Sequence, residues 1–191
     1  MRLNNLAPWA QSLVLEGRVF HASFATQTTP ISFTAYDQDR PDITVSCPDG
    51  AAIIPLYVKI ELEDSAGTDT EAVFFITDVA VGAGTSTAIT NGPHNMRSDI
   101  STRTSVATCV RTHTANITLT NYRELDRWVY AFADATAGPA KIIEYNPLAL
   151  NGLAPVINGP GTFCVAVAAT TTQAAGFAQV YWAEFAEGEL R

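Results

Sequence analysis

The sequence predicts an all-β protein: an antiparallel two-sheet sandwich of the jelly-roll type, preceded by a short N-terminal arm. Residues 51–63 alternate apolar and polar side chains, as a strand with one buried and one exposed face does. Turn-forming residues separate further segments of this kind along the chain. Helical periodicity is almost absent, and long strands joined by long loops favour a jelly roll over an immunoglobulin-type sandwich.

The clearest strand pair spans residues 51–81. The face predicted to be buried carries Ile54, Leu56, Val58, Ile60 and Leu62, and the opposite face carries Pro55, Tyr57, Lys59, Glu61 and Glu63. Residues 64–69 have the composition of a turn. Residues 72–79 are apolar on both faces, which is typical of a strand that lies deep in a sheet. We therefore expect this ribbon to be scaffold, with any working surface in the loop after it or in the arm.

Further strands are predicted from β-branched and aromatic residues at 18–26, 30–35, 42–47, 125–133, 141–145, 161–170 and 177–187. Residues 101–120 predict one long bent strand or a hairpin. Residues 81–100 predict a long loop, or a short edge strand within one. Residues 146–160 contain three prolines and predict an apolar loop. We assign residues 1–17 to the arm and 18–191 to a single domain.

Composition limits the partners that this chain can bind. Hydrophobic residues make up 47% and charged residues 16% of the chain, so its surface is thinly charged. The formal net charge is −8 and the arginines are scattered. Binding of nucleic acid or of an anionic membrane surface requires clustered Lys and Arg, so we expect neither partner. No apolar run has the length of a spanning helix, and the N-terminus lacks the apolar region of a signal peptide.

The three cysteines, Cys47, Cys109 and Cys164, are odd in number and widely spaced, which does not predict a disulfide framework. Each lies in a β-like segment, so we expect buried thiols in a protein made in a reducing cytoplasm. A bridge between two of them remains an alternative if their strands are neighbours.

No catalytic or cofactor motif is present. His21, His94 and His113 lack the spacing of a zinc pair, and neither a nucleophile elbow nor a phosphate-binding glycine loop occurs. Residues 37–42 and 64–71 offer carboxylates that could hold Ca²⁺, but solvated acidic loops are the simpler interpretation. Paired catalytic carboxylates remain an alternative because they meet in space and not in sequence. We expect no enzymatic activity, no cofactor and no metal.

Two further patterns have competing interpretations. Asn116-Ile117-Thr118 matches a glycosylation acceptor, but in a protein made in the cytoplasm it is part of a strand. The aromatic residues Trp128, Tyr130, Tyr181 and Trp182 could line a sugar platform, although a core or a subunit interface explains them better.

Three segments resemble jelly-roll structural proteins of virus particles, especially capsid-associated and decoration proteins of tailed bacteriophages. They are IIPLYVKIELEDSAGTDTE (53–71), VGAGTSTAITNGPHNMRSD (81–99) and TFCVAVAATTTQAAGFAQVYWAEF (162–185). The last one also resembles the closing strand pair of tumour-necrosis-factor-like trimeric jelly rolls. The resemblance covers residues 18–187 and implies a structural role in the virion and a trimeric assembly. It transfers no functional residue, because such families have no catalytic set.

We therefore expect a non-enzymatic structural protein of a virus particle, made in the host cytoplasm and located in the virion. It would form a homo-oligomer, a trimer by the resemblance, and bind other virion proteins. The predicted interface residues are Trp9 in the arm and Tyr181, Trp182 and Phe185 in the last strand. The alternatives are a receptor- or glycan-binding knob that uses loop 81–100 or 146–160, and, with less support, a jelly-roll hydrolase or lyase.

Overall fold

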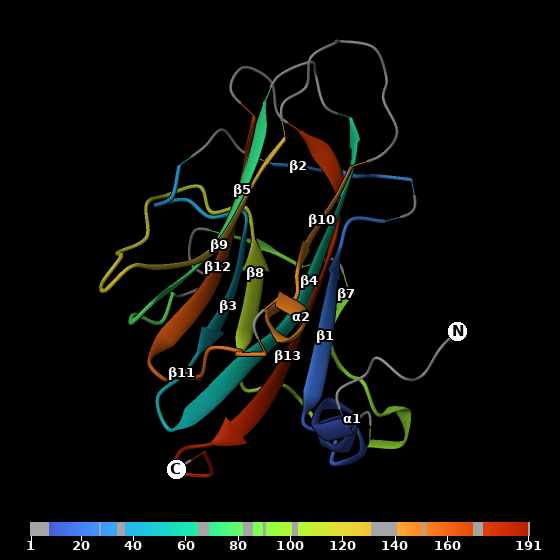
Figure 1. Ribbon diagram of the computed structural model, residues 1–191, viewed down its shortest axis with the longest axis vertical. Coiled ribbons are helices and arrows are strands. Elements are labelled where there is room, and N and C mark those ends of the chain that lie inside the picture. The colour runs from blue at the N-terminus through green and yellow to red at the C-terminus, as the bar shows by residue number, and fades with distance from the viewer. Residues whose placement is uncertain are drawn as a thin grey trace.

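The computed structural model describes residues 8–26, 28–33, 37–64, 69–81, 86–89, 91–100, 103–130, 141–150, 152–169 and 174–190. This part of the chain forms two antiparallel sheets that pack face to face, so the predicted all-β sandwich is confirmed (Figure 1). Within it, no helix has both the length and the apolar character needed to cross a membrane.

The first sheet has the order β10-β4-β13-β1-β7, with β11 beside β4 and β2 beside β13. Its strands are β1 (Val19–Phe24), β2 (Ile31–Ser32), β4 (Ala51–Asp64), β7 (Asn91–Asn95), β10 (Lys141–Tyr145), β11 (Ile157–Asn158) and β13 (Ala175–Ala186). The two longest strands, β4 and β13, pair along almost their whole length and form the centre of this sheet.

The second sheet has the order β6-β8-β3-β12-β5-β9. Its strands are β3 (Ile43–Cys47), β5 (Thr70–Thr77), β6 (Thr87–Ala88), β8 (Thr108–Arg111), β9 (Arg123–Tyr130) and β12 (Gly161–Ala169). The described residues also form three short helical elements: α1 (Pro8–Leu15), the 3₁₀ turn η3 (Ser98–Ile100) and α2 (Pro147–Leu150).

Eight of these strands pair in a nested order. In sequence they are β1, β3, β4, β5, β9, β10, β12 and β13. The first pairs with the last, the second with the seventh, the third with the sixth, and the fourth with the fifth. All of these pairs are antiparallel, so the ribbon folds back on itself and then wraps into two layers.

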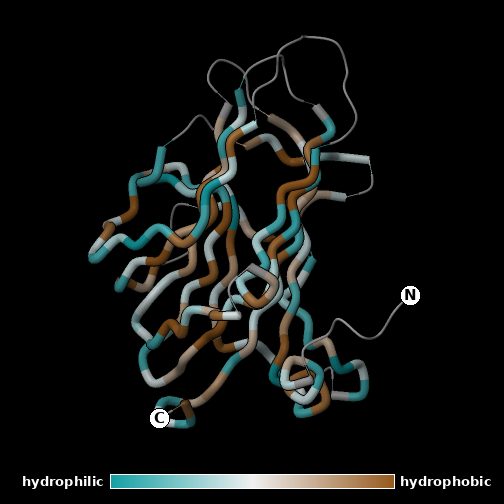
Figure 2. Tube along the Cα trace, in the orientation of Figure 1, coloured by the Kyte–Doolittle hydropathy of each residue, from teal (hydrophilic) through white to brown (hydrophobic). Residues whose placement is uncertain are grey.

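The main core lies between the two sheets and consists of inward-facing apolar side chains. Phe20, Phe24, Phe74, Phe163 and Trp182 are among its largest members, and each is at most 1% exposed. Figure 2 shows hydrophobic residues concentrated along the strands of both sheets. Burial of such side chains is the main force that stabilises the sandwich.

The predicted inward face of β4 is partly wrong. Val58, Ile60 and Leu62 lie in the main core as expected, but Ile54 and Leu56 belong to a second cluster on the outer face. The reason is a bulge: the pairing with β13 steps from Tyr57 to Pro55 and leaves out Leu56. One extra residue shifts the alternation, so the side chains before it change face.

An additional apolar layer covers each sheet from outside. Leu13 of α1 packs against Val19, Ile54, Leu56 and Ala183 on the first sheet. On the second sheet, Ile117, Leu119 and Tyr122 pack against Val73, Phe75, Cys164 and Ala166.

This outer layer corrects the prediction for residues 101–120. Among residues 103–120, which the structure describes, only Thr108–Arg111 is a strand, β8, and the chain that follows it is a covering segment. Ile117 and Leu119, whose alternation suggested a strand, instead lie against the sheet, and Thr114, Thr118 and Thr120 are exposed. The acceptor pattern at Asn116 therefore lies outside any strand.

The loop predictions have mixed outcomes. Residues 81–100 contain the short strands β6 and β7, at an edge of each sheet, as one alternative predicted. Residues 146–160 form α2 and β11 with irregular chain between them. Residues 65–68, the main part of the predicted turn at 64–69, lie outside the described residues. The same holds for residues 34–35, the end of the strand predicted at 30–35, and for residues 1–7 of the arm.

Candidate interaction surface

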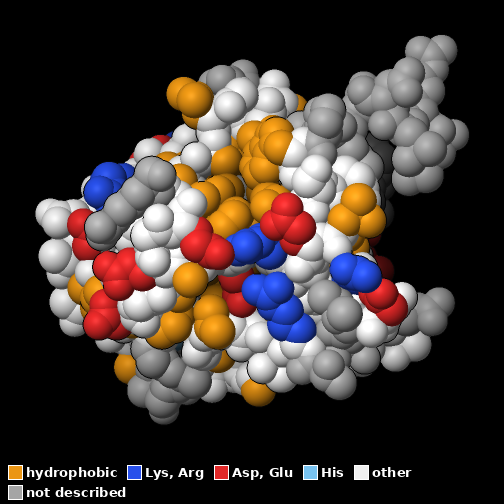
Figure 3. Space-filling model, turned by 90° about the horizontal axis from the view of Figure 1, so that it is seen from below, with side chains coloured by type: hydrophobic (Ala, Val, Ile, Leu, Met, Phe, Trp, Pro, Cys, Tyr) orange, Lys and Arg blue, Asp and Glu red, His pale blue; other side chains and the backbone are white. Residues whose placement is uncertain are grey.

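Exposed apolar side chains gather at one end of the sandwich, which we call the lower end: the end where α1 and the C-terminus lie in Figure 1. Nine large hydrophobic residues are exposed among those described, and six belong to segments at or near this end: Trp9, Leu15, Met96, Val106, Val156 and Leu190. Figure 3, seen from below, shows hydrophobic side chains gathered in the middle of this face beside a group of charged ones. Gathered exposed apolar side chains are typical of an interaction surface.

Three of the four predicted interface residues are accessible. Trp9 is 40% exposed on α1. Tyr181 and Phe185 are half-buried and pack beside the outer cluster of the first sheet. The α1 helix itself docks on its own subunit, through Leu13.

The prediction for Trp182 is wrong. This residue is 1% exposed and lies in the main core, so it offers no surface to a partner. Successive residues of a strand point to opposite faces, and Tyr181 takes the outer one. The Trp182 indole N–H donates a 2.9 Å hydrogen bond to the buried carboxylate of Glu184.

The C-terminus of α1 is closed by a Schellman motif. Gly17 has a positive φ of 69°. The Gly17 N–H donates to the carbonyl of Val14, and the Arg18 N–H donates to the carbonyl of Leu13, both at 2.9 Å. A left-handed residue at this position favours glycine, and the two bonds satisfy carbonyls that the helix leaves free.

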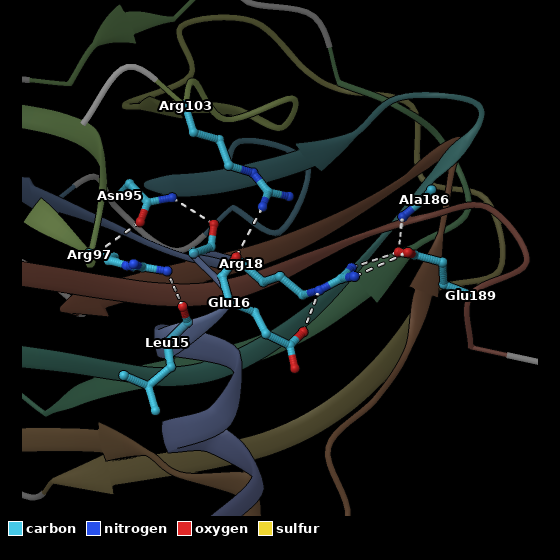
Figure 4. Close-up of polar contacts among 9 residues, drawn as sticks. Leu15, Glu16, Arg18, Asn95, Arg97, Arg103, Ala186 and Glu189 are labelled. Atoms are coloured by element: carbon cyan, nitrogen blue, oxygen red, sulfur yellow. Dashed lines mark hydrogen bonds and ion pairs between the residues drawn. The ribbon is translucent and has the colours of Figure 1, made fainter. Parts of the chain in front are cut away.

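Side chains from β7 and the segment after it bind the remaining carbonyls of this turn (Figure 4). Arg97 donates to the Leu15 carbonyl at 2.5 Å, and Asn95 donates to the Gly17 carbonyl at 2.7 Å. Arg103 donates to the Glu16 carbonyl at 3.4 Å. Cations near a helix C-terminus are favourable, so these contacts fix α1 to the body of the subunit.

Arg18 connects the two ends of the described chain. Its guanidinium donates to both carboxylate oxygens of Glu189, at 2.6 and 3.1 Å, and to Glu16 at 2.8 Å. It also lies over the ring of Phe185, 5.2 Å from the centroid. The Arg18 guanidinium, together with the Ala186 N–H, lowers the pKa of Glu189 to about 2.

The predicted aromatic platform is not one surface. Trp128 and Tyr130 stack on each other in β9 of the second sheet, with ring centroids 6.1 Å apart. Tyr181 lies on the outer face of the first sheet, 4.5 Å from the ring of His21. Trp182 is in the core.

The described residues do not assemble a nucleophile or a metal site. All three cysteines are free and buried, and burial raises the pKa of Cys47 to about 11. His113 is 1% exposed and contacts the Thr44 hydroxyl at 3.0 Å. His21 is half-buried, and this burial lowers the pKa of its imidazole. Nowhere in the described ranges do three potential metal ligands of the His, Cys, Asp and Glu types come together.

The acidic loop 37–42 separates its carboxylates. Asp37 pairs with Arg40 at 2.8 Å. Asp42 is 2% exposed and accepts the Val167 N–H at 2.7 Å. These side chains therefore organise the loop and the end of β3.

No protein-family model matches this chain, and comparisons with curated proteins and with solved structures also give no match.

Proposed function

We propose that this sandwich is a jelly roll and that the protein is a non-enzymatic structural subunit of a virus particle. The nested pairing of the eight strands supports the first part, because a jelly roll consists of eight strands wrapped in two Greek keys. Viral capsid proteins are a major use of this architecture, and the resemblance described for the sequence implies the same setting.

The observation that carries the assembly role is the apolar lower end. Six large apolar side chains in its segments are at least 39% exposed. A surface of this kind gains free energy when a neighbouring subunit covers it. The proposal is a homo-oligomer, a trimer by the resemblance, that contacts other virion proteins through this end. Trp9 and Leu15 on α1 are the proposed anchors, in keeping with the enrichment of aromatic residues at interface centres.

Light scattering on the purified protein tests this proposal. We expect a mass of three times the 20.4 kDa of one chain. The double variant Trp9→Ser/Leu15→Ser should shift the population towards monomer. The control is Val129→Ser, which removes an equally exposed apolar side chain from the edge strand β9 and should leave the mass unchanged. A monomeric wild-type protein that never sediments with particles would refute the proposal.

A receptor-binding knob is the second candidate. One observation favours it: the chain between α2 and β11, which belongs to the predicted binding loop 146–160, lines a pocket.

A further inference from the structure

An open pocket of about 530 Å³ lies on the flank of the sandwich, between edge strands of the two sheets. It is lined by Leu125, Asp126, Tyr145, Pro147, Leu153, Ala154 and Pro155. On the same flank, the Tyr130 hydroxyl of β9 donates to the carbonyl of Ile142 in β10 at 2.8 Å and ties the two sheets together. Five of the seven lining residues are apolar, and two carry polar groups.

The first polar group is the hydroxyl of Tyr145, a residue that as a whole is 2% exposed. The ring is fixed between Phe74 and Phe163, with centroids 5.1 and 5.5 Å away. Burial, and then the nearby carboxylate of Asp126, raises the pKa of Tyr145, so the hydroxyl keeps its proton. The described residues give this hydroxyl no hydrogen bond, and it is not one of the fully buried polar atoms, so it can meet a ligand in the pocket.

The second polar group is the carboxylate of Asp126. It accepts the Arg127 backbone N–H at 2.9 Å and the Trp128 indole N–H at 3.1 Å. These two neutral donors fix its orientation but do not cancel its charge. The guanidinium of Arg127 turns elsewhere, to Glu124 and Glu71. No cation among the described residues forms an ion pair with Asp126, so each carboxylate oxygen keeps acceptor capacity for a ligand.

We propose that this pocket binds the side chain of a lysine from a protein partner, with the ammonium group held by Asp126 and the Tyr145 hydroxyl. The methylene groups of the lysine would lie against Leu125 and the proline rings, since long cationic side chains bury their stems on apolar surface. An ammonium group compensates the charge of the Asp126 carboxylate. A neutral sugar would displace water from this carboxylate without compensating its charge. The exposed side chain of Leu153 at the rim would contact a residue next to the lysine.

This proposal is independent of the assembly proposed above, because it is tested on the isolated protein. The probe is the capped peptide acetyl-Leu-Lys-Leu-amide, titrated into the full chain by calorimetry. We expect saturable binding that weakens as salt increases. The same peptide with norleucine in place of lysine keeps the stem and loses the charge, so it should bind at least about tenfold more weakly. Equal binding of the two peptides to the wild-type protein would overturn the proposal.

Variants then locate the site. Asp126→Asn keeps an acceptor for the Trp128 indole and should weaken the lysine peptide at least about tenfold. Tyr145→Phe should weaken it about threefold to tenfold. The matched control Glu63→Gln removes an exposed carboxylate outside the pocket and should bind as the wild type does. Unchanged binding by Asp126→Asn would overturn the proposal.

Two further probes distinguish other ligands. Leu153→Ser should weaken binding of the lysine peptide but not binding of 1,5-diaminopentane, because only the peptide has a neighbouring residue that contacts the rim. Binding of the diamine without the peptide would show a free polyamine as the ligand and overturn the choice of a protein partner. Binding of glucose, galactose or lactose in place of both would overturn the choice of an amine.

Discussion

Glu184 and Ser105 are 79 residues apart in sequence, yet the Ser105 hydroxyl donates a 2.5 Å hydrogen bond to the Glu184 carboxylate. The same carboxylate accepts the backbone N–H groups of Val106 and Ala107, at 3.1 and 3.2 Å, and the Trp182 indole N–H. Glu184 is only 3% exposed. Four donors therefore stabilise one buried charge and attach the segment after β7 to the last strand.

Replacing Glu184 with Gln should destabilise the protein. The amide group of Gln has one oxygen, which can serve either the three donors that face Oε1 or the Val106 N–H that faces Oε2, and its NH₂ group then opposes the donors on the other side. We expect the free energy of unfolding in urea to fall by about 2 kcal/mol. Glu63→Gln, an exposed change of the same kind, should stay within about 0.5 kcal/mol of the wild type. Equal stability of the two variants would show that the Glu184 contacts contribute nothing.

Gly159→Ala should be among the most damaging single-atom additions. A Cβ at this position would lie 1.7 Å from the carbonyl oxygen of Pro48, so the backbone would have to move. We expect a loss of more than about 2 kcal/mol in the free energy of unfolding. At Gly152, φ is +70° but nothing lies within 4 Å, so alanine there should cost only about 1 kcal/mol. Similar costs at the two positions would contradict the close approach of residue 159 to Pro48.

His113 should make stability depend on pH. Burial lowers the pKa of His113 below the 6.5 of a free histidine. The unfolded chain therefore binds this proton more readily, so stability is complete above about pH 6.5 and falls as the pH decreases. Unfolding in urea at pH 7.5 and 5.5 measures the difference. His113→Gln should reduce the fall, and His21, whose pKa burial also lowers, should supply part of what remains. An unchanged fall would contradict a neutral buried His113.

The Arg18–Glu189 ion pair should make stability depend on pH in a more acidic range than His113 does. The pKa of Glu189 is about 2, against an ordinary value of 4.5. The stabilisation is therefore present above about pH 4.5 and is lost as the pH falls towards 2. Glu189→Gln should lower the melting temperature at pH 6 and flatten its decline between pH 4.5 and 2.5. Parallel melting curves of wild type and variant over this range would contradict the prediction.

Most long strands could be predicted from local patterns. Residues 161–170 and 177–187 were expected as strands and correspond to β12 and β13. Residues 161–168 are apolar on both faces and are buried on both faces. The apolar side chains of β13 alternate with more exposed ones along much of its length. Such segments are predictable because burial of a strand face is encoded within the segment itself.

Two errors come from local signals that were not applied. The bulge at Leu56 lies beside Pro55, and a proline inside a strand favours a bulge, so a signal for the change of face of Ile54 was present but was not applied. The signal for Trp182 was simpler: it follows Tyr181 directly, and the alternation of a strand already excludes both from one surface.

The pocket could not have been predicted from sequence. Asp126 and Tyr145 belong to β9 and β10, which lie in different sheets, and only the wrapping of the chain brings them to one pocket. The lining by Pro147, Leu153, Ala154 and Pro155 agrees with the expectation that loop 146–160 would carry a binding surface, which stays a prediction until a ligand is found.

The central claim is that subunits meet through the lower end, and hydrogen–deuterium exchange of the protein at high and low concentration tests it most directly. The account predicts that association slows exchange in α1 and in the described amides around Met96 and Val106, with no change in β9. Slower exchange confined to the edge strands β9 and β10, or no dependence on concentration, would contradict it.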